Sequence, residues 1–61
     1  MFQKGDIVKF KFRDNNIQHY LLMSESHPLE NKIHYEALNL MTGTLSNLHL
    51  IDGDKDIQKV A

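Results

Sequence analysis

The chain has 61 residues, 41% of them hydrophobic, so it suffices for one small domain and is too apolar for a disordered segment. Seven basic and eight acidic residues leave a formal net charge of −1, without the basic excess that is typical of nucleic-acid-binding modules. No cysteine is present, which excludes disulfides and thiolate zinc sites, and no apolar run approaches the roughly 20 residues of a membrane span. The first residues lack a secretory-signal pattern. We therefore expect a single cytoplasmic domain over residues 1–61 that makes no membrane contact.

Residues 4–12 predict the first strand, because apolar and basic side chains alternate strictly along them. Three apolar residues share one face and three basic residues share the other: Val8, Phe10 and Phe12, and Lys9, Lys11 and Arg13. We expect the apolar face to be buried and the basic face to meet solvent.

Asn15 and Asn16 predict a two-residue turn, since asparagine tolerates a positive φ, and residues 17–24 then return antiparallel. The expected pairs are Phe12 with His19, Phe10 with Leu21 and Val8 with Met23 on the apolar face, and Lys11 with Tyr20 and Lys9 with Leu22 on the other. After this hairpin, residues 25–32 predict a polar, mobile loop that contains the single proline, Pro28.

Residues 33–41 and 44–51 predict a second hairpin across Thr42 and Gly43. The expected pairs are Leu40 with Leu45, Ala37 with Leu48 and Tyr35 with Leu50. Apolar residues change phase along both strands, which favours a bent hairpin that passes from one sheet of a small barrel to the other. The alternative is that Leu38, Leu40 and Leu45 form an exposed apolar patch that binds a partner.

The C-terminal residues have two interpretations. Asp54 or Asp56 would cap a single helical turn, or residues 57–60 would form a closing strand beside the first one. Four long strands and a short fifth predict an all-β fold, a five-stranded antiparallel barrel.

Gly5-Asp6-Ile7-Val8, followed by alternating basic and aromatic residues, resembles the opening strand of small SH3-like barrels, which include the KOW and Tudor modules. The motif covers about eight residues, and the similar strand count and spacing extend over most of the chain. The chain lacks the later glycine and the basic excess of KOW modules, so the resemblance does not imply RNA binding. No residues match a Tudor aromatic cage. In general texture the chain is also similar to the short accessory proteins of tailed phages, which would place it in the host cytoplasm.

No metal or cofactor site is predicted. Asp52, Asp54 and Asp56 begin like a calcium loop, but Ile57 occupies the position of the required glycine, and the chain ends before the required glutamate. The four histidines match no dedicated metal site in their spacing; they are His19, His27, His34 and His49. Under the register above, the second hairpin brings His34 and His49 near each other on opposite pleats.

No nucleophile elbow, phosphate loop or catalytic cysteine is present, so we expect no enzyme and no small-molecule substrate. The sequence predicts a non-enzymatic protein-interaction module whose partner is either another protein or a second copy of the chain. The predicted binding surface is formed by Leu38, Leu40 and Leu45 or by an open edge strand. The alternative is a nucleic-acid-binding accessory factor, whose basic and aromatic face would comprise Lys9, Lys11, Arg13 and Tyr20.

Overall fold

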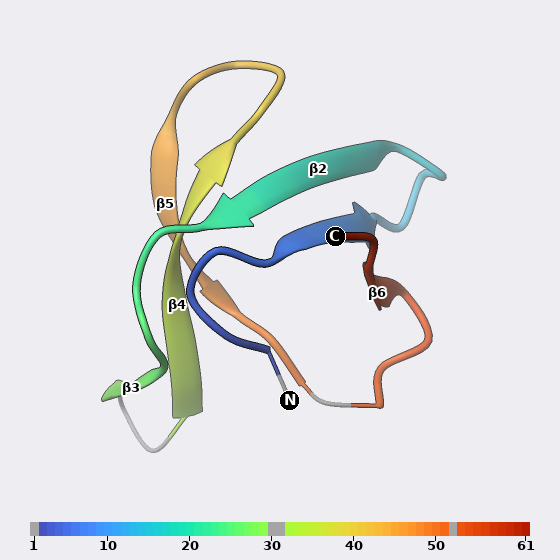
Figure 1. The fold of residues 1–61 in the computed structure, drawn as a ribbon. Helices are drawn as coiled ribbons and strands as arrows, with labels where there is room; N and C mark the ends of the chain where they lie inside the picture. The colour runs from blue at the N-terminus through green and yellow to red at the C-terminus, as the bar shows by residue number, and fades with distance from the viewer. Residues whose placement is uncertain (1, 30–31, 52) are drawn as a thin grey trace.

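The computed structural model describes residues 2–29, 32–51 and 53–61, and this part of the chain contains six β-strands and no helix (Figure 1). The strands are β1 (Ile7–Lys11), β2 (Ile17–Leu22), β3 (His27–Leu29), β4 (Lys32–Asn39), β5 (Leu45–His49) and β6 (Ile57–Lys59). They form one antiparallel sheet in the order β3-β4-β2-β1-β6, and β5 pairs with β4. The prediction of an all-β antiparallel fold is therefore confirmed.

The sheet is organised on β4, because this strand pairs with three others, β2, β3 and β5. Leu38 of β4 lies between Leu21 of β2 and Leu45 of β5. Beside the first half of β4, β3 takes the place of β2. Figure 1 shows the β4–β5 pair crossing the β1–β2 pair steeply, as in a strongly twisted sheet.

The concave side of the sheet holds the hydrophobic core. Its buried side chains are Val8, Tyr20, Leu22, Tyr35, Ala37, Leu50 and Ile57. The N-terminal segment covers one end of this core, where the hydroxyl group of Tyr35 donates a hydrogen bond of 3.0 Å to the carbonyl oxygen of Phe2. Their rings also meet edge to face at 6.4 Å. β1, β2, β4, β5 and β6 thus each contribute to or pack against this one core.

Among the described residues no backbone pairing joins β5 to β6, so hydrogen bonds do not close the sheet into a barrel. Leu50 and Ile57 are instead buried in the core from the segments that follow β5 and open β6. The predicted closing strand beside the first one is confirmed, since Phe10 of β1 pairs with Ile57 of β6. The helical turn is not formed; Asp54 accepts a hydrogen bond from the backbone N–H of Asp56 in a turn before β6.

The register predicted for the first hairpin is wrong by three residues, and this changes the face on which the returning side chains lie. Val8 lies opposite Tyr20, not Met23. The loop has three residues rather than two, because Phe12 donates its backbone N–H to the carbonyl oxygen of Asn16, and Asn15 adopts a φ of 64°. A turn followed by one left-handed residue is a common three-residue hairpin loop. The buried face of β1 is as predicted for Val8 and Phe10, whereas Phe12 is exposed.

The register predicted for the second hairpin is wrong by two residues, which preserves the faces. Leu38, not Leu40, lies opposite Leu45. The predicted change of buried face does not occur in β4, since Tyr35, Ala37 and Asn39 are buried in strict alternation. The tip leucines therefore lie on the outer, convex face, as in the alternative that the sequence left open.

The segment predicted to be a loop contains a strand. β3 pairs with β4, placing Pro28 opposite Ile33. Proline is acceptable there because β3 is a short edge strand, where one missing backbone N–H removes no central ladder bond.

Candidate interaction surface

An apolar row crosses four strands on the outer face of the sheet. Residue pairing places Ile7 beside Leu21, Leu21 beside Leu38, and Leu38 beside Leu45. The first three side chains are half-buried by their neighbours, and Leu45 at the end of the row is 66% exposed. The row therefore runs from the middle of the sheet to an exposed leucine on β5.

The β4–β5 tip extends this apolar surface. Asn39 holds the tip: its side-chain oxygen accepts hydrogen bonds from the backbone N–H groups of Met41 and Thr42, at 2.9 and 3.1 Å. Leu40 donates its own backbone N–H to the carbonyl oxygen of His19 at 2.9 Å, which fixes the tip against β2. Leu40 and Met41 are 48% and 76% exposed. We call Leu38, Leu40, Met41 and Leu45 the tip patch.

The free edge of β5 adjoins the tip patch. The backbone N–H of Asn39 donates to the carbonyl oxygen of Thr44 across the hairpin. In an antiparallel pair, every second residue bonds to its partner strand, counted here from Thr44. The residues of β5 in between therefore direct their N–H and C=O groups away from β4. The outward residues are Leu45, Asn47 and His49. β5 contains no Asp, Glu, Lys, Arg or Pro, the residues that commonly protect an edge strand.

The other two terminal strands of the described sheet are better protected. β3 has three residues and contains Pro28. β6 also has three residues and contains Lys59, whose ammonium nitrogen lies 3.5 Å from a carboxylate oxygen of Asp6. β5 is thus the described edge strand with the greatest capacity to pair with another strand.

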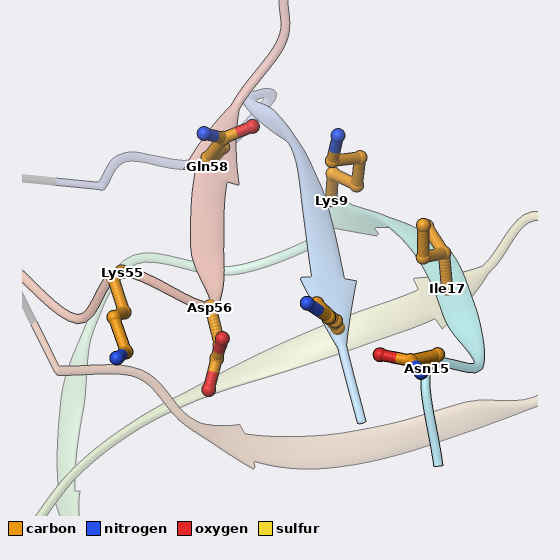
Figure 2. A pocket seen from close by; sticks show the side chains of 7 residues that line it. Lys9, Asn15, Ile17, Lys55, Asp56 and Gln58 are labelled. Carbon is orange, nitrogen blue, oxygen red and sulfur yellow. The ribbon is translucent and has the colours of Figure 1, made fainter. Parts of the chain in front are cut away.

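A basic hollow occupies a different part of the outer face, where β2, β1 and β6 meet (Figure 2). It measures about 600 Å³, and most of its lining side chains are exposed, so it is a surface depression. Its lining residues are Lys9, Lys11, Asn15, Ile17, Lys55, Asp56 and Gln58. Three lysines and one carboxylate give this hollow a net positive charge. Lys55 was not predicted, because only the pairing of β6 with β1 brings it here.

The structure divides the basic and aromatic face that the sequence predicted. Lys9 and Lys11 line the hollow together. Tyr20 does not belong to it, since the side chain is 7% exposed and lies in the core on the opposite face. Arg13 lies in the exposed turn after β1 and is not among the lining residues. The aromatic part of the predicted face is therefore wrong.

The predicted calcium-like aspartates form a turn. Asp54 and Asp56 are joined by the side-chain to backbone hydrogen bond described above, and Asp52 lies outside the described residues. Within the described ranges, no three His, Asp or Glu side chains converge on one metal position. His34 and His49 are near each other as predicted, but they lie directly opposite each other on one face.

Comparison of the chain with protein-family models, with curated proteins and with solved structures finds no match. The comparisons identify no family, so what is established is a small all-β protein. Over the described ranges, no helix has the length and apolar character needed to cross a membrane.

Proposed function

We propose that this chain is a non-enzymatic protein-interaction module that self-associates through the β5 edge and the tip patch. The observation that carries the proposal is the coincidence of an unprotected edge with exposed leucine side chains. Leu45 belongs to both, since it ends the apolar row and directs its backbone outward. The SH3-like resemblance stays part of this proposal: the position of β6 beside β1 supports it, whereas the lack of hydrogen-bonded closure leaves the sheet more open than such barrels.

A second copy of the chain is the partner that this edge fits best. Antiparallel pairing of two β5 strands about a two-fold axis at Asn47 would set Leu45, the tip-patch residue on β5, opposite His49 of the other copy. This pairing would satisfy the outward backbone groups of both copies. Because β5 contains no charged residue, the pairing opposes no like charges. A 61-residue domain also has a small core, and association is a common way for such domains to gain stability.

Sedimentation velocity over a dilution series from about 1 mM to 1 µM tests the proposal. The wild-type chain should change from dimer to monomer on dilution. Leu45→Lys should abolish the dimer, because it places a charge on the edge and shortens the apolar row. Val60→Lys is the matched control: Val60 is 51% exposed and follows β6, so this variant should dimerise like the wild type. A wild-type chain that stays monomeric at the highest concentration contradicts the proposal.

The basic hollow supports a second candidate function, binding of single-stranded nucleic acid. Lys9 and Lys11 lie together there, and Lys55 adds a third positive charge. Such a face holds the phosphate backbone electrostatically. Tyr20 is left out of this proposal because it is buried.

Binding of labelled single-stranded DNA at several salt concentrations tests the second candidate. Lys9→Glu combined with Lys11→Glu should abolish salt-sensitive binding. Lys4→Glu combined with Lys32→Glu makes the same charge change at exposed lysines outside the hollow and should retain most of the binding. Equal losses in the two double variants would contradict a site in the hollow. Leu45→Lys should leave DNA binding intact, which separates the two functions.

A further inference from the structure

Three of the four histidines lie in one row across β3, β4 and β5. His27 pairs with His34, and His34 pairs with His49. Residues that lie directly opposite each other on neighbouring strands project to the same side of a sheet, so the three rings share one face. The fourth histidine, His19, lies apart on β2.

The two pairs differ in how closely the rings approach. In an antiparallel pair, hydrogen-bonded and non-hydrogen-bonded residue pairs alternate, and Asn39 and Thr44 form a hydrogen-bonded pair. Counted from there, His34 and His49 form a non-hydrogen-bonded pair, the type in which opposite side chains lie closest. Their ring centroids are 5.4 Å apart, compared with 6.4 Å for His27 and His34. The closer pair is therefore the His34–His49 pair.

This separation suits two imidazoles on one metal ion. With a metal–nitrogen bond of about 2.0–2.1 Å, two ring centroids on a tetrahedral ion lie roughly 5 Å apart. Imidazole is a preferred ligand of Zn²⁺, Ni²⁺ and Cu²⁺. The ring centroid of His27 lies 6.4 Å from that of His34, which is wider than for two imidazoles on one tetrahedral ion.

A contact with a backbone carbonyl orients the ring of His34 for metal binding. Its Nδ1 atom lies 3.3 Å from the carbonyl oxygen of Lys32, a contact in which an Nδ1–H group donates to the carbonyl. This tautomer leaves Nε2 with its lone pair free for a metal. Metal-binding histidines commonly donate their other ring N–H to a backbone carbonyl in this way, which fixes the ring orientation.

We propose that His34 and His49 bind one divalent transition-metal ion on the outer face of the β4–β5 hairpin, with water completing its coordination. The ion would cross-link the two strands of the hairpin. Within one chain this site is separate from the tip patch and the basic hollow. His49 also belongs to the β5 edge of the proposed dimer, so the site is tested on monomeric protein.

Titration of tag-free monomeric protein with ZnCl₂, followed by isothermal calorimetry and by the imidazole NMR signals, tests this site. The signals of His34 and His49 should shift with a stoichiometry of one ion per chain. His34→Gln and His49→Gln should each weaken binding by about tenfold or more, because each removes one of two protein ligands. His19→Gln and His27→Gln are the controls and should stay within about twofold of the wild type.

Two results would overturn the site. One is the absence of any histidine signal change at about 1 mM Zn²⁺, a concentration at which a site with a Kd of about 0.1 mM would be about 90% occupied. The other is equal weakening by His49→Gln and His19→Gln, which would indicate scattered binding to surface histidines. Because His49 is exposed, we expect His49→Gln to fold, and circular dichroism on the same samples verifies this.

Discussion

Val8 of β1 lies directly opposite Tyr20 of β2, and both side chains are buried in the core. The pair fixes the register of the first hairpin, because moving either strand by one residue would turn one of these side chains to the outer face. Val8 faces the core, so the next residue, Lys9, faces the outer side of the sheet, where it lines the basic hollow. Tyr20 thus has a structural role.

Tyr20→Ala should lower the free energy of unfolding by about 3–4 kcal/mol, because it leaves a cavity where a large ring was packed. A chain of this length has roughly 3–5 kcal/mol of total stability, so the variant should be largely unfolded at room temperature. Urea denaturation followed by circular dichroism measures the change. Ile17→Ala, on the exposed outer face, should cost below about 1 kcal/mol. Similar losses in the two variants would contradict the core position of Tyr20.

Asn15 is the residue on which the three-residue loop depends. Its φ of 64° is a left-handed conformation that glycine and asparagine adopt more readily than other residues. Asn15→Gly should therefore be nearly neutral, whereas Asn15→Ala should destabilise the domain by about 1 kcal/mol. Thermal unfolding of the three proteins tests the order. If the alanine variant matches the glycine variant, the positive φ does not hold in solution.

The first hairpin shows where sequence reasoning succeeds and where it fails. The alternation in β1 predicts the buried face of Val8 and Phe10 correctly. Two adjacent asparagines allow either a two-residue or a three-residue loop, and the sequence offers no means of choosing. The choice depends on which register buries Tyr20 and Leu22 against the rest of the core, and that is a tertiary effect.

The prediction for the second hairpin is wrong for a different reason. The prediction assumed that its leucines must be buried, and so required a bend. The structure instead gives the core position at the tip to a polar residue, Asn39, and leaves Leu40 and Leu45 exposed. The histidine row was missed because β3 was not predicted, and without that strand His27 has no register relative to His34.

The polar side chain of Asn39 can be buried because its amide oxygen and nitrogen both have hydrogen-bond partners. Besides the two loop N–H groups that its side-chain oxygen accepts, its side-chain nitrogen donates to Gln18 at 3.1 Å. Asn39→Ala should cost about 2–3 kcal/mol, since it leaves these partners without their bonds. Asn47→Ala changes an exposed asparagine of the same hairpin and should stay within about 0.5 kcal/mol of the wild type. Chemical denaturation compares them, and an equally mild Asn39→Ala would show that water replaces the lost bonds.

Proline substitutions on β5 separate the backbone contribution to dimerisation from that of the side chains. The N–H of Asn47 points to the free edge, so Asn47→Pro removes no ladder bond within the chain and should cost at most about 1 kcal/mol. It should nevertheless abolish the dimer, because the ring occupies the position where a second strand would pair. Ser46→Pro, one residue earlier, removes a bond to β4 and should destabilise the monomer by about 3 kcal/mol. Sedimentation and thermal unfolding of both variants measure the two effects. A folded Asn47→Pro variant that still dimerises would exclude pairing along β5 and leave the tip patch as the contact.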